Sequence, residues 1–277
     1  MPELPEVETT RRGIEPFLAG HRIEGVAVRD ARLRWPVRAD LATFLTGRPV
    51  EAVERRAKYL LLCLDGGDRV LIHLGMSGSL RLDDPSNPPR KHDHVEWRLD
   101  NGRVLRLHDP RRFGAVLTDR VDAPHERLER LGPEPLGPSF DGDHLASRLA
   151  GRRVAIKQAI MNADIVVGVG NIYASEALFL AGIHPMTPAG RLDHDECHAL
   201  AAAIRQVLTA AIEQGGTTLR DFLAPSGNPG YFRQTLTVYE RTGQPCRRCG
   251  TPIERVVLGQ RSTWFCPGCQ AAETRRR

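Results

Sequence analysis

The chain has 277 residues, a length that predicts two domains more readily than one. Hydrophobic residues make up 41% of the chain and charged residues 26%, with no apolar run long enough to cross a bilayer. The first twenty residues carry several glutamates and arginines and lack the apolar stretch of a secretory signal. These features argue against membrane and secreted proteins, and we expect a cytoplasmic globular protein.

The distribution of charge favours a polyanionic partner. The net charge is +5, and residues 241–277 alone hold eight Arg and two Glu, with no Lys or Asp. An excess of this kind at one end of the chain is typical of a surface that contacts nucleic acid. We expect that end of the chain to carry the main basic surface.

Residues 20–120 predict a β domain. Short apolar alternations dominate this part of the chain, and Val95, Trp97 and Leu99 alternate with polar residues before the turn sequence Asn101-Gly102. The apolar run 104–107 then returns, which predicts a hairpin. A β-sandwich or a barrel accommodates such a pattern.

The chain changes character after residue 130. Gly and Pro are concentrated in 131–142, which favours a linker between domains. Beyond it, Asp193 with Glu196 predicts the start of a helix that ends before Gly215-Gly216. The apolar stripe of this helix comprises Cys197, Leu200, Ala201, Ile204, Leu208, Ala211 and Ile212. We expect domains at 1–130 and 143–238, the linker 131–142, a cysteine module at 239–272 and a basic tail at 273–277.

Four cysteines near the end of the chain predict a metal site. Cys246 and Cys249 form one Cys-x-x-Cys pair, and Cys266 and Cys269 form a second pair sixteen residues later. Paired thiolates at this spacing can each supply half of a tetrahedral zinc site. A disulfide pair is the alternative, but it requires an oxidising compartment. We therefore expect one structural Zn²⁺.

Arg261 lies between the two cysteine pairs. Residues 253–265 have room for a two-stranded hairpin around Gly259, which would place Arg261 near its tip. A guanidinium there can reach a phosphate or a groove, although a solvated arginine is an equally ordinary outcome.

Three glycine-containing turns carry candidate nucleic-acid contacts. Arg111 and Arg112 precede Phe113 after a proline turn, a combination suited to phosphate contact and base stacking, although such a pair is commonly a solvated strand edge. Met76 lies between small residues, where an exposed apolar side chain can enter a base step; core packing is the alternative. Residues 167–170 form a glycine turn before an expected helix at 172–181, whose first N–H groups can bind phosphate or belong to an ordinary turn.

The amino terminus offers a candidate nucleophile. Pro2 is small enough to permit removal of Met1, which leaves a secondary amine with a pKa of roughly 7.7 to 8. Such an amine can form an iminium with an aldehyde-like carbon, and Glu3 can act as the proton donor. An inert terminus is the common alternative.

Together these residues closely resemble the formamidopyrimidine-DNA glycosylases, bacterial base-excision repair enzymes related to endonuclease VIII. The resemblance runs nearly from end to end of the chain. It rests on Pro2 to Thr9, Arg56 to Leu60, His73 to Gly78, Lys91 to Val95, Asp109 to Gly114, Gly168 to Glu176, Gln214 to Thr218, Pro229 to Phe232 and the four-cysteine module.

The resemblance implies an α+β protein of two domains, with an N-terminal β-sandwich and a C-terminal helix–two-turn–helix domain that ends in a zinc finger. It implies a monomer that binds damaged double-stranded DNA between its halves, flips out an oxidised purine and excises it. Pro2 would attack C1′ and form a Schiff base, Glu3 would protonate the opening sugar, and β- and δ-elimination would cut the strand.

Other roles also follow from the resemblance alone. Lys58 and Arg261 match proton-donor or phosphate-binding positions, and residues 217–239 match a segment whose mobile part closes over an everted purine. The void left by the flipped nucleotide would be filled by Met76, Arg111 and Phe113. Backbone or lesion contacts would come from His92, Arg152, Lys157 and Asn171.

Two departures and two alternatives accompany the resemblance. Asn162-Ala163-Asp164 stands where the family has Asp first and a cation last, and Glu240 replaces a usual glycine. An endonuclease VIII-like enzyme for oxidised pyrimidines would share Pro2 and Glu3, but Leu4 and the void-filling residues favour the purine branch. A non-catalytic zinc protein that binds DNA would leave the amino terminus without a role.

Overall fold

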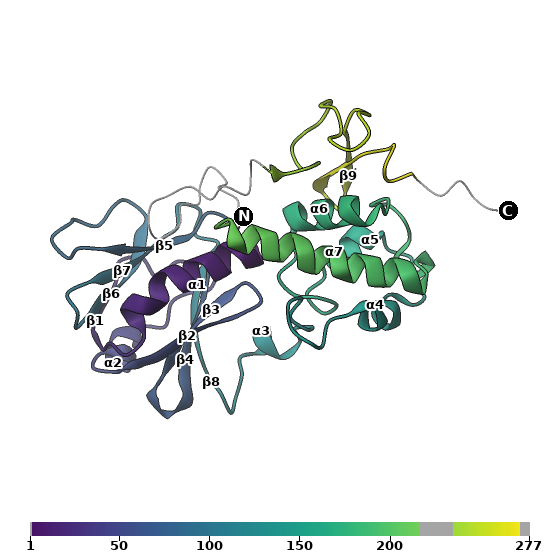
Figure 1. The fold of residues 1–277 in the computed structure, drawn as a ribbon. Coiled ribbons are helices and arrows are strands. Elements are labelled where there is room, and N and C mark those ends of the chain that lie inside the picture. Colours follow the sequence, from purple (N-terminus) through teal and green to yellow (C-terminus); the bar gives the residue numbers. More distant parts are fainter. Residues whose placement is uncertain (1, 217–234, 272–277) are drawn as a thin grey trace. The chain divides into compact units, whose positions relative to one another are not determined.

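The computed structural model describes residues 2–216 and 235–271, and the chain divides into two compact units (Figure 1). The first unit comprises Met1–Glu129 and Ile212–Arg233, and the second comprises Arg130–Ala211 and Gln234–Arg277. Within the described residues, no helix combines the length and the apolar character needed to cross a membrane.

The first unit is built on two four-stranded antiparallel sheets. One sheet has the order β1 (Ile23–Val28), β6 (Asp93–Leu99), β7 (Val104–His108), β5 (Ser79–Asp83). The other has the order β2 (Val50–Arg56), β3 (Tyr59–Leu64), β4 (Asp68–His73), β8 (Ala115–Arg120). The expected hairpin is present, since β6 pairs with β7 around Asn101-Gly102.

A single apolar core joins the two sheets. Leu60, Leu62 and Ile72 from one sheet and Trp97 and Leu105 from the other belong to the same buried cluster. Alternate residues of each strand supply this cluster because side chains alternate between the faces of a strand. The first unit is therefore the expected β-sandwich.

A helix that the sequence patterns did not predict opens the first unit. α1 (Leu4–Leu18) buries Val7, Ile14 and Leu18 in the sandwich core and packs against β2. Shorter helical segments are α2 (Leu41–Leu45), the 3₁₀ turn η1 (Asp65–Gly67) and α3 (Glu126–Glu129). α1 positions the amino terminus on a packed element, which matters for the site described below.

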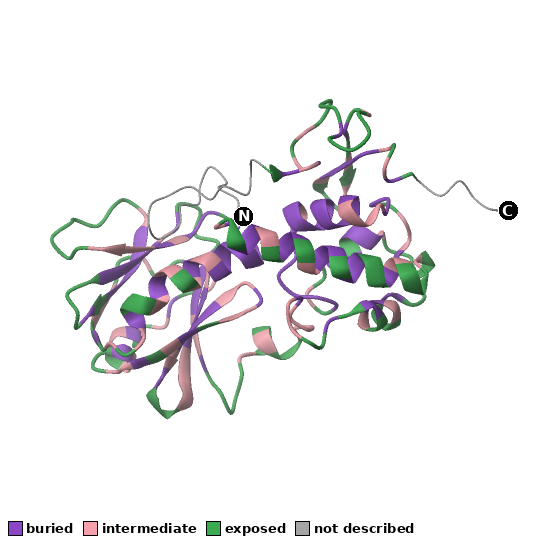
Figure 2. Cartoon of the chain, in the orientation of Figure 1, coloured by how far each residue is buried: buried purple, intermediate pink, exposed green. Residues whose placement is uncertain are grey.

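The second unit is helical. It contains α4 (Gly142–Leu149), α5 (Ile156–Ile160), α6 (Asn171–Ala181), η2 (Ala189–Arg191) and α7 (His194–Glu213), whose last two residues are grouped with the first unit. The predicted apolar stripe of α7 is buried, from Cys197 to Ile212. α6 is buried over nearly all of its surface (Figure 2), so it forms the centre of this unit.

The linker and the cysteine module complete the second unit. Residues 131–141 contain neither helix nor strand, and Arg205 of α7 donates hydrogen bonds to the carbonyls of Gly137 and Phe140. β9 (Glu254–Leu258) and β10 (Arg261–Phe265) form the expected hairpin, with Arg261 opposite Leu258 at its tip.

Candidate active site and nucleic-acid interface

The amino terminus is fixed by the start of α1. Glu3 is the N-cap residue, and its side chain accepts from the backbone N–H of Glu6. The Glu6 carboxylate in turn accepts from the Glu3 N–H at 2.8 Å, which completes a capping box. Pro2, immediately before it, is also buried. Reciprocal capping therefore gives the Pro2-Glu3 pair a defined position, and Glu6 is a residue of this site that sequence reasoning did not single out.

A glycine of the first unit lies against the same carboxylate. Gly216 has φ +79°, and a Cβ built on it would lie 3.1 Å from Oε1 of Glu6. Only glycine adopts this conformation without strain while leaving that space. The Gly215-Gly216 pair therefore allows the backbone to approach the capping box closely.

Lys58 lies in the turn between β2 and β3. Ala57 before it has φ 55°, and the paired strands bring Tyr59 opposite His73. Burial, and next the positive charge of Lys58, lower the pKa of His73 to about 4. The Nδ1 atom of a neutral His73 accepts the N–H of Gly75 at 2.9 Å. Gly75 belongs to the Met76 turn (residues 74–78), so His73 is a neighbour of both this turn and the Lys58 turn.

One buried carboxylate connects the Met76 turn to the Arg111 turn (residues 109–114). Asp109 is fully buried; its Oδ1 accepts from the Ser77 hydroxyl at 3.0 Å and its Oδ2 from the Gly114 N–H at 2.7 Å. The backbones of the two turns can approach each other because residue 75 is glycine: a Cβ at Gly75 would lie 2.4 Å from the backbone of Phe113. The structure thus brings together two turns that the sequence only marked separately.

The two turns present exposed side chains. Met76 is 40% exposed and Phe113 is 42% exposed, which contradicts the core alternative for Met76. The guanidinium of Arg111 lies 4.9 Å from the centre of the Phe113 ring. Two exposed apolar side chains beside a stacked guanidinium suit insertion into a base stack.

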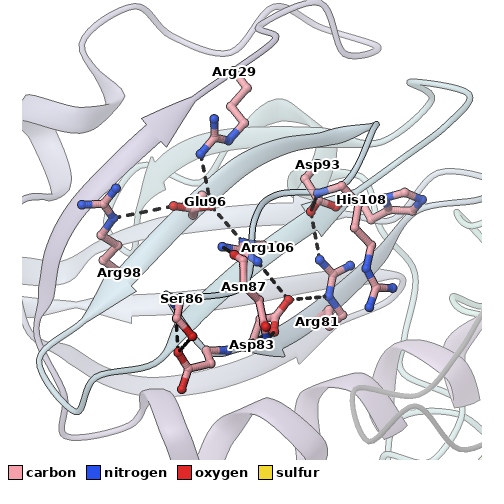
Figure 3. A network of polar contacts seen from close by, with 12 residues as sticks. Arg29, Arg81, Asp83, Ser86, Asn87, Asp93, Glu96, Arg98, Arg106 and His108 are labelled. Atoms are coloured by element: carbon pink, nitrogen blue, oxygen red, sulfur yellow. Dashed lines mark hydrogen bonds and ion pairs between the residues drawn. The ribbon is translucent and has the colours of Figure 1, made fainter.

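His92 ends a loop that a polar network holds on the sheet. Arg106 is buried and donates to Glu96, to Asp83 and to the carbonyl of Asn87 in this loop (Figure 3). His92 has φ 75°, and its carbonyl accepts from the backbone N–H at position 109 at 3.0 Å. The network therefore places His92 beside the Arg111 turn.

The second unit contains a pocket with two cationic residues. Its lining includes Lys157, Asn171, Gly259 and Arg261. The Lys157 ammonium donates to Oδ1 of Asn171 at 2.7 Å and to Oγ1 of Thr263 at 2.8 Å, which joins α5, the start of α6 and the hairpin. A helix start beside two cations suits a phosphate group.

Arg152 lies apart from that pocket. Its Nε donates to the carbonyl of Arg148 at 2.6 Å, at the end of α4, so the structure does not group it with Lys157 and Arg261.

The two departures from the family pattern lie at Asn162-Ala163-Asp164 and at Glu240. At the first, the side chain of Asn162 accepts the backbone N–H of Asp164 at 3.0 Å. At the other, Glu240 has φ 59° and so adopts the left-handed conformation of the glycine that it replaces.

The four cysteine sulfurs lie within 4.8 Å of one another. The Sγ atoms of Cys246 and Cys269 are 3.9 Å apart, and those of Cys249 and Cys266 are 3.4 Å apart. Bonds of about 2.3 Å in a tetrahedral site place sulfurs about 3.8 Å apart. This donor set therefore fits zinc. Within the segment 217–239, whose mobile part is expected to close over an everted purine, residues 217–234 lie outside the described residues, as does the tail at 273–277.

Comparison with known protein families gives three matches along the chain. Residues 1–116 match the formamidopyrimidine-DNA glycosylase N-terminal domain, and residues 131–223 match the formamidopyrimidine-DNA glycosylase H2TH domain. Residues 243–272 match the zinc finger found in FPG and IleRS. The four cysteines are thus the ligands of one structural Zn²⁺.

Curated proteins and solved structures agree with these matches. The formamidopyrimidine-DNA glycosylases of Thioalkalivibrio sulfidiphilus and Methylococcus capsulatus are 61% and 59% identical to the chain, each over 98% of it and their own full length. The MutM (FPG) protein of Thermus thermophilus is 42% identical, with a TM-score of 0.88 over 97% of this chain and 98% of its own.

A structure of the Lactococcus lactis Fpg with DNA containing an abasic site is 33% identical, with a TM-score of 0.91 over 98% of this chain and all of its own. These similarities cover both units and the zinc finger. The chain belongs to the formamidopyrimidine-DNA glycosylase family.

Proposed function

We propose that this glycosylase and abasic-site lyase removes oxidised purines, formamidopyrimidines and 8-oxoguanine among them, from duplex DNA through the amine of Pro2. The observation that carries the proposal is the buried capping box that fixes Pro2 and Glu3 at the start of α1. The Lactococcus lactis relative binds DNA containing Fapy-dG, and another complex contains an abasic site.

The chemistry requires a free amine and a proton donor. After removal of Met1, the Pro2 nitrogen attacks C1′ of the damaged nucleotide. The base leaves with the electron pair of the glycosidic bond and takes up the proton that the Pro2 nitrogen loses. The ring oxygen O4′ then leaves C1′ as the iminium forms and takes a proton from Glu3. The iminium acidifies C2′, so elimination expels the 3′ phosphate and then the 5′ phosphate.

The remaining residues contact the DNA. Met76, Arg111 and Phe113 fill the space of the flipped nucleotide, which offsets part of the few kcal/mol that eversion costs. Phosphate and backbone contacts come from Lys58, His92, Arg152, Lys157, Asn171 and Arg261. The positive pocket of the second unit supports this assignment for Lys157, Asn171 and Arg261. We further propose that the enzyme acts as a monomer in the bacterial cytoplasm.

The test is borohydride trapping on a duplex with one 8-oxoguanine opposite cytosine. We expect a lesion-dependent covalent adduct that maps to Pro2. Pro2→Gly replaces the secondary amine with a primary amine and should trap more slowly, whereas one extra residue before Pro2 should abolish trapping and preserve DNA binding. Undamaged duplex is the control.

The same assay distinguishes the substrate branches. A duplex that carries an oxidised pyrimidine should trap less efficiently than the purine lesion if the chain is a purine enzyme. Equal or faster trapping on the pyrimidine would refute the purine assignment while leaving the amine mechanism intact. An adduct that maps to a lysine would refute the role of Pro2.

A further inference from the structure

Three side chains that play no part in the proposed reaction meet where α4 and α7 begin. His194 and His198 are four residues apart on α7, and Asp143 is in the first turn of α4. The Nε2 atoms of His194 and His198 lie 2.7 Å and 3.2 Å from Oδ1 of Asp143. All three side chains are exposed, so an ion in the solvent can reach them.

The first turn of α7 is held in place by its own capping box. The Asp193 N–H donates to the Glu196 carboxylate at 2.9 Å, and the Glu196 N–H donates to the Asp193 carboxylate at 2.8 Å. This box fixes the helical turn that carries His194. Two histidines spaced i, i+4 then project from one helix face, the spacing at which a histidine pair chelates zinc.

A glycine brings the third ligand to this pair. A Cβ on Gly142 would lie 2.3 Å from Cγ of His198, so α4 approaches α7 this closely only with glycine at that position. Asp141 caps α4 by accepting the His144 N–H at 2.8 Å, which fixes the turn that carries Asp143. The cluster is therefore set by backbone geometry on both helices.

We propose that Asp143, His194 and His198 form a second metal site, which binds a divalent ion of the nickel, copper and zinc group. Bonds of about 2.0 to 2.2 Å in a tetrahedral site place neighbouring ligand atoms about 3.3 to 3.6 Å apart. The nitrogen–oxygen separations of 2.7 Å and 3.2 Å therefore have to widen by less than about 1 Å to admit an ion, which exposed side chains can do. Two imidazoles and one carboxylate favour these ions over Mg²⁺ and Ca²⁺, which prefer oxygen ligands. Water completes the coordination.

The site is independent of the zinc finger. It contains no thiolate, and its two helices contribute no lining residue to the pocket of Lys157 and Arg261. An ion bound here links the starts of α4 and α7. Because it binds the folded chain, it should raise the temperature of unfolding without changing the chemistry at Pro2.

The test uses the zinc-loaded full chain, dialysed against Ni²⁺, with zinc and nickel measured on the same sample. We expect one zinc and one nickel per chain, and a higher Tm with nickel than without. The double variant His194→Gln, His198→Gln should keep its zinc and lose the nickel. Asp143→Asn, which keeps the histidine pair, should retain nickel less tightly.

The matched control is His21→Gln. His21 forms an exposed pair with Asp100 at 2.8 Å, but it lacks a second histidine, so this variant should bind nickel like the unaltered chain. Nickel retained by the double histidine variant would refute the site. Nickel uptake matched by an equal loss of zinc would also refute it, because the nickel would then be in the finger. A third refuting result is that the unaltered chain retains no more nickel than the double variant.

Discussion

Asp109→Ala removes the carboxylate that connects the Met76 turn to the Arg111 turn. Two hydrogen bonds to a charged acceptor disappear, from the Ser77 hydroxyl and from the Gly114 N–H, and Asp109 is fully buried. Such bonds contribute about 1.5 to 3 kcal/mol each, so we expect unfolding to become easier by about 3 to 6 kcal/mol. Domains are ordinarily stable by about 5 to 15 kcal/mol, so the variant still folds if the unaltered domain is stable by more than about 6 kcal/mol.

Asp109→Asn is the matched variant. Its carbonyl oxygen can accept from the Gly114 N–H, and its amide can donate to the Ser77 hydroxyl, which turns to accept. Both contacts are thereby retained without the charge, and we expect a loss of about 1 kcal/mol. Asp109→Ala loses both the charge and the hydrogen bonds between the turns, whereas Asp109→Asn loses only the charge. A comparison of their stabilities therefore gives the contribution of the hydrogen bonds.

The assays are urea unfolding and single-turnover excision on a duplex with one oxidised purine. With Ala at position 109, the turns that carry Met76 and Phe113 lose their shared support, and excision should fall about 10- to 100-fold, which corresponds to about 1.4 to 2.7 kcal/mol of activation free energy. Cleavage of a preformed abasic site should fall less, because no base has to leave the stack. Normal stability and normal excision in Asp109→Ala would refute the reasoning.

Three further predictions concern pH, the finger and a strained turn. The pKa of His73 is about 4 in the folded chain against an ordinary 6.5, so the unfolded chain binds the proton first and stability falls by up to about 3 kcal/mol between pH 6.5 and 4; His73→Gln should show a smaller fall in urea unfolding over that range. Removal of zinc should abolish DNA binding, because the hairpin that carries Arg261 loses its support, while circular dichroism retains the sandwich signal; unchanged DNA affinity would contradict this. Glu240→Gly should raise the free energy of unfolding by up to about 1 kcal/mol because φ is 59° there, whereas Glu240→Ala should not.

Local patterns predicted the elements whose signals lie within one segment. The hairpin around Asn101-Gly102, the buried stripe of α7 and the hairpin of the finger each depend on residues close in the chain, and all three are present. α1 escaped prediction because Pro16 lies inside it and its N-cap is glutamate, which is not among the preferred capping residues. Packing on the sandwich core overrides these weak local preferences.

The same distinction between local and long-range signals applies to the candidate site. Sequence patterns identified Met76, Arg111 and Arg261 individually, since each lies in or directly beside a turn with a distinctive composition. They could not identify the contacts that position them, because Ser77 and Asp109 are 32 residues apart and Lys157 and Thr263 are 106 apart. Such pairings depend on strand order and helix packing, which no single segment encodes.

This division also applies to the places of the residues that we propose to contact DNA. Met76 and Arg111 are in turns, and Arg261 begins the strand that follows the turn of the finger hairpin; at these positions a side chain can reach a ligand without disturbing a sheet or a helix. A turn alone would leave their positions undefined, and each turn is therefore held by a buried polar group at its base: Asp109 for the first two and Lys157 for the third. A buried polar group raises the free energy of the folded state unless all its hydrogen bonds are made. Few conformations of each turn make all the hydrogen bonds of Asp109 or Lys157, so these side chains restrict the conformation of the turn. The exposed side chains that we propose to contact the DNA are thus positioned by buried polar groups beneath their turns.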